Sequence, residues 1–198
     1  MHDVGTGARA VLARRTGRSV SLRGASDAAL VRAAQAGSDE AVEALFARHW
    51  PDAYRAAYLI ARDRAAAEDI AQEAFLAAVR ALARFDRRRP LRPWLHRIVV
   101  NRAIDWSRAR ALRQEVDVDG VPELPAAHAG SPDLLDSEIA GALAALSAEQ
   151  RAVVVLRYLL EFTPGEIATA LDLPRGTVNS RLRRGLDALG SALGDEPR

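Results

Sequence analysis

The spacing of apolar residues predicts two amphipathic helices in the first half of the chain. Over residues 65–85, apolar side chains recur at intervals of three and four, the period of one helix face. The residues on this face are Ile70, Ala74, Phe75, Ala78, Val79, Leu82 and Phe85. A second helix follows Pro93, which suits a first turn, and its apolar side is Leu95, Val99, Ala103 and Trp106. Both helices have one side to bury and therefore belong to a packed helical domain.

Helix start signals dominate the carboxy-terminal part. Ser147 and Gln150 have the spacing of a capping box and predict a helix that runs to about Leu160. Thr163, Pro164 and Glu166 predict a second, short helix that ends near Leu171. After a tight break at residues 172–174, a third helix runs to about Leu189, with Val178, Leu182, Leu186 and Leu189 on its core side. Two short helices joined by such a turn are typical of a helix-turn-helix.

Charge divides the chain into segments. Residues 77–113 hold eleven arginines against two aspartates, whereas residues 115–138 hold seven acidic residues and no basic one. The acidic stretch is also rich in Gly and Pro and shows no helical period. We therefore expect an all-α protein of two small helical domains joined by a flexible acidic linker. The expected segments are a disordered Arg-bearing arm (1–25), a first domain (26–113), the linker (114–136), a helix-turn-helix domain (137–193) and a tail (194–198). The linker is either a solvated spacer or a nucleic-acid mimic that covers a basic surface.

Composition excludes several functional classes. The chain has no cysteine, and its four histidines lie far apart, so neither disulfides, Cys-ligated zinc nor another metal site is expected. No nucleophile with its base and no third metal ligand near Asp69 and Glu73 is evident, so we expect no enzyme and no cofactor. No apolar run is long enough to span a membrane, so we expect a cytoplasmic protein without membrane insertion.

The helix after residue 174 carries the strongest candidate for binding nucleic acid. Opposite its core side, the outward face presents Thr177, Ser180, Arg183 and Arg184, with Asn179 and Arg181 on the flanks. Such side chains reach base edges and phosphates when a helix enters the major groove of DNA. An ordinary amphipathic surface helix is the alternative, although surface helices usually mix both charge signs and Asp187 is the one acid nearby.

Two further surfaces are candidates in the first domain. A polar stripe opposite the core of the 65–85 helix consists of Asp69, Gln72, Glu73, Leu76 and Arg80. Leu76 is either an apolar anchor for a protein partner or one of the exposed leucines common on any surface. On the next helix, Arg97, Asn101 and Arg108 face outward with Asp105 at the edge. Trp94 and Trp106 beside these cations suit stacking on single-stranded bases, or they belong to the core.

Three motifs in order give the chain a resemblance to a known family. They are residues 67–76 (AEDIAQEAFL), the segment from Pro93-Trp94-Leu95 through Asn101 to Asp105 and Arg108, and the blocks Leu146-Ser147, Leu156-Arg157-Tyr158, Glu166-Ile167-Ala168 and 176–182. Together, across an acidic linker, they resemble the extracytoplasmic-function (ECF) group of bacterial RNA polymerase sigma factors. Each motif alone is weak because helix-turn-helix proteins are numerous.

The resemblance implies a role for each candidate residue. Asp69, Gln72, Glu73, Leu76 and Arg80 would bind core RNA polymerase. Trp94, Arg97, Asn101, Asp105 and Arg108 would contact the promoter element near minus ten. Arg175, Thr177, Asn179, Ser180, Arg181, Arg183 and Arg184 would read the element near minus thirty-five. Family members are commonly held inactive by an anti-sigma protein. The alternative is a helix-turn-helix regulator that is not a polymerase subunit, but it would need a receiver or ligand domain, usually with strands.

Overall fold

The computed structural model describes residues 24–116 and 137–194 of the 198-residue chain. Within these two ranges all regular structure is helical, which confirms the all-α prediction. The first group of helices is α2 (Asp27–Gln35), α3 (Asp39–Ala61), α4 (Arg64–Leu82) and α5 (Leu91–Val116). The second group is α6 (Ser137–Ala144), α7 (Ala148–Val154), the π-helical turn η1 (Val155–Leu159), α8 (Pro164–Leu171) and α9 (Arg175–Ala192). The expected arm, linker and tail lie largely outside the described residues.

Capping side chains fix where the helices begin. Before α2, α3 and α4, the side chains of Ser26, Ser38 and Asp63 each accept a backbone N–H from the first turn. These bonds satisfy amide groups that the helix itself leaves without a partner. Arg62 closes α3 in the left-handed conformation, with φ at 57°, and so turns the chain sharply into α4.

The capping box predicted at Ser147 and the helix start predicted at Thr163 are both present, and the second is a capping box too. Before α7, Ser147 accepts the N–H of Gln150, and the Gln150 side chain accepts the N–H of Ser147. Thr163 and Glu166 make the same reciprocal pair before α8. After α8, the chain turns through Asp172 in the left-handed conformation (φ 54°) and enters α9. The α8–turn–α9 segment is therefore the expected helix-turn-helix.

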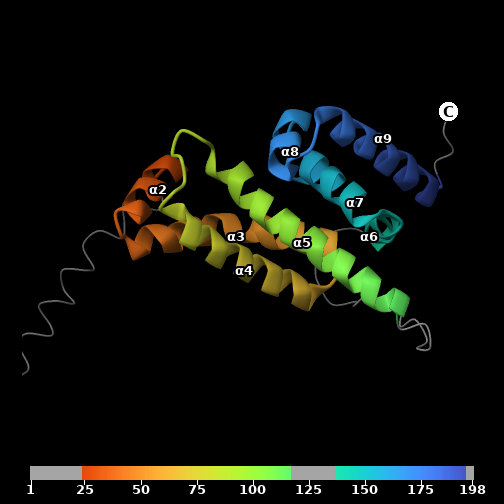
Figure 1. Ribbon diagram of the computed structural model, residues 1–198, viewed down its shortest axis with the longest axis horizontal. Coiled ribbons are helices and arrows are strands. Elements are labelled where there is room, and N and C mark those ends of the chain that lie inside the picture. The colour runs from red at the N-terminus through yellow and green to blue at the C-terminus, as the bar shows by residue number, and fades with distance from the viewer. Residues whose placement is uncertain (1–23, 117–136, 195–198) are drawn as a thin grey trace, which may run out of the picture.

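In the first group, α3, α4 and α5 pack against one another (Figure 1). Small residues on the facing sides permit this close packing, and Ala53, Ala56, Ala57, Ala67 and Ala74 are completely buried. A smaller cluster under α2 joins Leu30 and Val31 to Leu45 and Leu91. These helices form a rigid platform from which the outer faces of α4 and α5 project.

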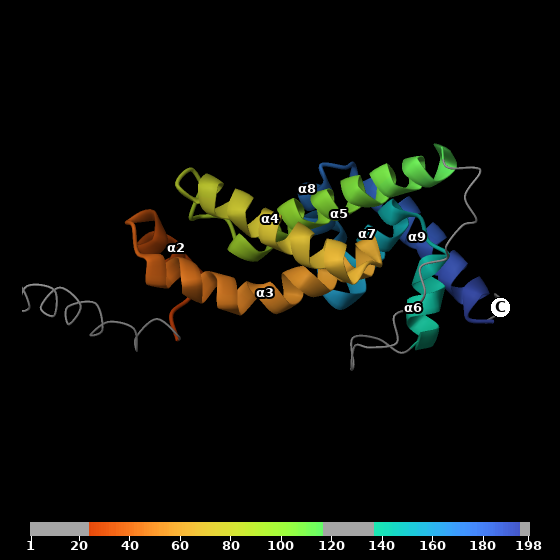
Figure 2. The same cartoon turned by 90° about the horizontal axis from the view of Figure 1, so that it is seen from below.

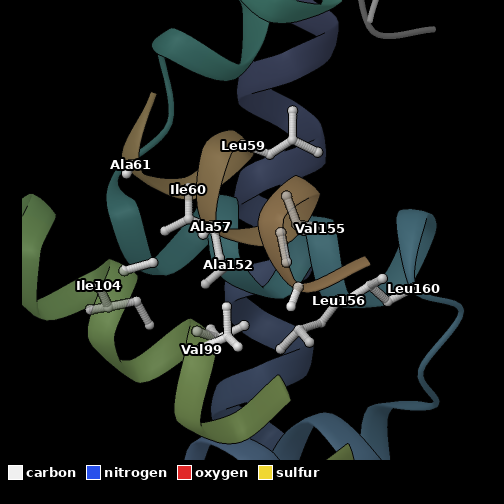
Figure 3. Close-up of a cluster of buried hydrophobic side chains, with 14 of the residues drawn as sticks. Ala57, Leu59, Ile60, Ala61, Val99, Ile104, Ala152, Val155, Leu156 and Leu160 are labelled. Carbon is white, nitrogen blue, oxygen red and sulfur yellow. The ribbon is translucent and has the colours of Figure 1, made fainter. Parts of the chain in front are cut away.

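The two groups of helices share one hydrophobic core. α7, η1 and α8 lie on α3 and α5, whereas α9 is on the outer edge of the molecule (Figures 1 and 2). Figure 3 shows the contact, where Ile60, Val99 and Ile104 meet Ala152 and Leu156. Ile60, Val99, Ala152 and Leu156 are fully buried. The described helices of the two groups thus pack directly against each other.

A buried arginine spans the contact between the two groups. The guanidinium of Arg151 donates to the carbonyl oxygens of Leu143 and Leu146 in its own group and to that of Ile60 at the end of α3. The residue is 7% exposed, and burial, with the nearby charge of Arg62, lowers its pKa to about 10. Within the described residues its hydrogen-bond acceptors are all carbonyl groups, whose partial negative charge does not fully replace water around the cation.

Two residues expected on buried faces are exposed. Val79 is 44% exposed because it lies at the margin of the buried side of α4, next to Leu76. Leu186 is 41% exposed, and Gly185 occupies the core position that we predicted for Leu186. A Cβ atom on Gly185 would lie only 3.0 Å from Val154 Cγ2, so the absence of a side chain lets α9 approach α7 closely. The buried face of α9 therefore continues from Leu182 to Gly185 and not to Leu186.

Candidate polymerase and nucleic-acid interfaces

The stripe on α4 is exposed along its whole length, as expected. Asp69, Gln72, Glu73, Leu76 and Arg80 all lie on the surface, and Leu76 is 56% exposed. Glu73 accepts a hydrogen bond of 2.7 Å from Arg102 of α5. This bond fixes one carboxylate beside the apolar side chain. The stripe has the form of a protein-docking surface, an apolar anchor with polar groups around it.

The apolar part of this surface is larger than the stripe suggested. Phe46 on α3 is 40% exposed and packs against Phe75, with ring centroids 4.7 Å apart. It also stacks on Trp50 at 4.8 Å. With Leu76 and Val79, Phe46 makes three exposed apolar side chains around the α3–α4 contact. We define these three residues as the docking patch; the sequence pattern showed only Leu76, because Phe46 comes from another helix.

On α9, the predicted reading face is largely open. Arg175, Asn179, Arg183 and Arg184 are exposed, whereas Thr177, Ser180 and Arg181 are half-buried. Ser180 donates its hydroxyl proton to the carbonyl of Thr177 at 3.0 Å, and Arg184 Nε bonds to the carbonyl of Ser180 at 3.3 Å. Arg183 and Arg184 are therefore the most accessible cations at the middle of the helix, and Ser180 is more recessed than expected.

The arginines of α9 are electrostatically unbalanced. In the ranges that the structure describes, none of Arg175, Arg181, Arg183 and Arg184 forms an ion pair with a carboxylate. Their guanidinium groups keep donors free for an external acceptor. A helix that carries several such cations and exposed amide groups fits the phosphates and guanine edges of duplex DNA.

The absence of a side chain at Gly165 leaves room for the first of these cations. The Arg175 side chain lies over the first turn of α8, and a Cβ on Gly165 would come within 2.5 Å of Arg175 Nη2. Glu166 caps the same turn through Thr163, and the hydrogen bonds from the Thr163 backbone and hydroxyl hold the pKa of that carboxyl below its usual value. The carboxylate is thus committed to the helix cap although it lies near arginines.

The predicted site residues on α5 face different surroundings. Trp94 is half-buried and packs against Phe85, with ring centroids 4.7 Å apart. Arg97 and Asn101 are half-buried, whereas Asp105 and Arg108 are exposed. The structure therefore does not bring these five residues onto one open surface. Trp106, the other tryptophan of this helix, packs partly on the core and carries the Arg110 guanidinium at 5.2 Å from its ring.

Two of these α5 residues contribute to a groove between the two groups of helices. The groove has a volume of about 590 Å³ and lies between the amino-terminal half of α5 and α8. Trp94 and Arg97 line it from one side, and Arg175 lines it from the other. Residues expected to contact different promoter elements therefore meet in one groove.

Arg108 takes part in a contact across the two groups. Its Nε donates to Glu149 of α7 at 2.7 Å. Burial raises the pKa of Glu149, but the hydrogen bond and the charge of Arg108, together with backbone and Ser147 bonds, outweigh it and leave the pKa below its ordinary value. Glu149 therefore stays ionised and holds Arg108 against the second group.

A buried histidine lies at the same contact. His96 is fully buried and meets the ring of Phe162 edge-on, with centroids 5.7 Å apart. Its Nδ1 bonds to the carbonyl of Arg92, which makes Nε2 the unprotonated nitrogen, and Nε2 has no partner. Burial, which the Arg92 bond only partly offsets, lowers the pKa of His96 from 6.5 to about 4. The ring is thus neutral at physiological pH.

The described residues show no group of three or more His, Cys, Asp or Glu side chains able to hold a metal ion. None of the described helices is both long and apolar enough to cross a membrane.

The comparisons with known proteins agree with this division into two parts. The Sigma-70 region 2 family matches residues 45–113, and the Sigma-70 region 4 family matches residues 136–189. The chain is 36% identical to the ECF RNA polymerase sigma factor SigL of Mycobacterium tuberculosis over 179 residues, covering 86% of this chain and 92% of SigL. It is 34% identical to SigW of Bacillus subtilis, covering 65% of this chain and 76% of SigW.

Two solved structures have a similar fold. CnrH, solved in complex with the cytosolic domain of CnrY, aligns with a TM-score of 0.65 at 29% identity, covering 86% of this chain and 99% of CnrH. The sigma factor RpoE of Bartonella quintana, solved with the anti-sigma factor NepR, aligns with a TM-score of 0.63 at 27% identity, covering 78% of this chain and 98% of RpoE.

The fold and its surfaces are those of a two-part helical protein that binds DNA through a helix-turn-helix. The chain belongs to the ECF group of the sigma-70 family. It is a transcription initiation factor that binds core RNA polymerase and directs it to promoters; a regulator outside the polymerase is not favoured. Residues 45–113 are its region 2 and residues 136–189 its region 4.

Proposed function

We propose that the docking patch and the α4 stripe bind the polymerase core, while α9 reads the upstream promoter element. The observation that carries this division is the exposure of two chemically different surfaces. One is apolar, around Leu76, and the other is cationic, around Arg183 and Arg184. An apolar anchor suits a protein partner, whereas unpaired arginines suit DNA.

For α9, the exposure of each side chain and its place along the helix indicate its role. Arg183 and Arg184 project from the middle of the helix and are placed to reach base edges, together with Asn179. Arg181 is half-buried at the flank and contacts a phosphate. Arg175 and Thr177, at the start of the helix, and the recessed Ser180 complete the surface.

For α5, Trp94, Arg97, Asn101, Asp105 and Arg108 contact the element near minus ten. The half-buried Trp94 offers one ring face for stacking on an unpaired base, and the arginines neutralise phosphates. Because Arg108 bonds to Glu149 and Arg97 lines the groove beside α8, region 4 has to move away before all five residues reach one strand.

An anti-sigma protein is the proposed regulatory partner. RpoE, which this chain resembles in fold, was solved with the anti-sigma factor NepR. The protein acts in the cytoplasm, where polymerase and DNA are found, and it contributes no catalytic group or cofactor of its own.

Run-off transcription tests the proposal. Purified chain is added to core polymerase on genomic fragments, and the products reveal the promoters that depend on it. We expect discrete transcripts that disappear when Arg183 and Arg184 are both replaced by Ala, whereas Arg113→Ala, an exposed change at the end of α5, retains them. Transcripts that persist with both replacements would remove α9 from the reading role.

A further inference from the structure

The groove between α5 and α8 gathers cations from both groups of helices. It has a volume of about 590 Å³ and lies where the amino-terminal half of α5 runs beside α8 (Figure 1). Arg89 lines it from the loop between α4 and α5, Arg97 from α5, and Arg175 from the start of α9. This volume is typical of sites for small molecules, and a DNA duplex is too wide to enter it. The groove is therefore a candidate site for a small anion.

These three arginines lack an internal counter-charge. In the part of the chain that the structure describes, no carboxylate forms an ion pair with Arg89, Arg97 or Arg175. Among the described residues that line the groove, Glu166 is the one acid, and its carboxylate accepts two hydrogen bonds of 2.8 Å from the backbone and hydroxyl of Thr163. The lining thus keeps an excess of positive charge. Guanidinium groups in this state bind phosphate oxygens with two parallel hydrogen bonds.

A tryptophan adds a second kind of binding surface to the groove. Trp94 lines it and is half-buried, so part of the indole ring is open to a ligand. Phe85 packs against the ring, with centroids 4.7 Å apart, and restrains it. Arg97 follows three residues later and lies on the same side of α5. An open aromatic ring stacks on nucleobases with little preference among them, and the neighbouring cations suit the phosphates joined to such a base.

We propose that this groove binds a free nucleotide with two or more phosphate groups, its base on Trp94 and its phosphates between Arg97 and Arg175. Arg89 supplies a third cation from the loop. An inorganic anion would leave the ring unused, and an uncharged ring would leave the arginines unused. The site does not depend on the proposed function, because it needs neither polymerase nor promoter. Under the proposed function, a bound nucleotide keeps Trp94 and Arg97 from the promoter strand.

Calorimetric titration of the full-length chain with three probes tests the site. ADP carries a base and two phosphates, adenosine carries no phosphate, and pyrophosphate carries no base. We expect ADP to bind roughly tenfold more tightly than pyrophosphate, because stacking adds to the phosphate contacts, and adenosine to bind most weakly. No binding of ADP, or equal affinities for ADP and pyrophosphate, overturns the proposal. It is also wrong if a single-stranded tetranucleotide binds and ADP does not, since the groove then serves a DNA strand.

Two substitutions on α5 separate the contributions of ring and charge. Trp94→Ala should weaken binding of ADP about tenfold and leave pyrophosphate binding unchanged. Trp94→Phe retains a ring and should retain most of the affinity for ADP. Arg97→Ala should weaken binding of both probes by about tenfold, because a charge-assisted hydrogen bond is lost in each case. If Trp94→Ala weakens ADP and pyrophosphate equally, the ring only supports the fold and the proposed stacking is wrong.

Matched arginines test whether the groove itself holds the phosphates. Arg88 and Arg89 are exposed neighbours in one loop, but only Arg89 lines the groove. Arg89→Ala should therefore bind ADP several-fold more weakly than the parent, whereas Arg88→Ala, with the same loss of charge, should bind as the parent does. Arg175→Ala, on the opposite side, should lose about tenfold. Equal affinities of the Arg88 and Arg89 variants, or an unchanged affinity of Arg175→Ala, contradict a nucleotide held between the two groups of helices.

Discussion

His96 should make the protein sensitive to mild acid. The ring is neutral and fully buried in the folded chain, with a pKa lowered from 6.5 to about 4 by burial. Between these two values the unfolded chain binds a proton that the folded chain does not. The free energy of unfolding therefore falls as pH decreases through this window.

The size of the effect follows from the two pKa values. For a group that titrates at 6.5 when unfolded and about 4 when folded, lowering the pH from about 7 to about 5 costs roughly 2 kcal/mol of stability. Most of the loss comes below pH 6.5, where the unfolded chain is increasingly protonated. Above pH 7 both states are neutral at this site and the contribution vanishes.

Comparison with His96→Phe isolates the contribution. Phenylalanine retains an aromatic ring against Phe162 but does not titrate. The test is therefore how the stability of each protein changes with pH, and not the stability of the variant at any one pH. Urea unfolding at a series of pH values between 7 and 5 gives the slope for each protein. We expect the parent to lose about 2 kcal/mol more than the variant, because all other titrating groups are shared. Equal slopes would show that the imidazole is hydrated in the folded state and that our account of its burial is wrong.

Two further predictions test the proposed surfaces. Leu76→Asp should weaken the complex with core polymerase by about 2 kcal/mol or more, as for other hot spots. In a pull-down titration the control Leu112→Asp, also at an exposed leucine, should bind as the parent does. Unchanged binding of Leu76→Asp would show that Leu76 is not an anchor. Arg184→Ala should lose more affinity on the true upstream element than on a scrambled duplex, by about 1–3 kcal/mol, whereas Arg181→Ala should weaken both about equally and lower the salt slope by about one unit. Binding of the full-length chain to both duplexes over a salt series measures this, and an equal loss for Arg184→Ala on the two duplexes means that another residue reads the bases.

Local signals in the sequence predicted helix starts and exposed stripes well. The predicted capping box at Ser147 and the predicted helix start at Thr163 both formed, because they depend on residues three positions apart and on nothing distant. The α4 stripe is exposed as its helical period predicted. The family resemblance likewise rests on short motifs, and the matches to regions 2 and 4 confirm it.

The sequence pattern did not predict features that depend on contacts between residues far apart in the chain. Gly185 has no side chain to give a hydrophobic signal, yet it packs closely on Val154 of α7, so Leu186 was wrongly placed in the core. Ile60 and Ile104 look like core residues of their own helices, and nothing in their spacing reveals that region 4 covers them. The roles proposed for individual site residues remain predictions, because contacts with a binding partner produce no periodic pattern in the sequence.

Gly165 has a consequence for how promoter preference can evolve. It lies one helix before the reading helix, but a methyl group there would come within 2.5 Å of the Arg175 guanidinium. A side chain at this position displaces the end of that exposed arginine at the entrance of α9. Under the proposed function, a residue with no DNA contact of its own thereby affects how the first arginine approaches its base or phosphate. Drift in target choice does not need a mutation on the reading face.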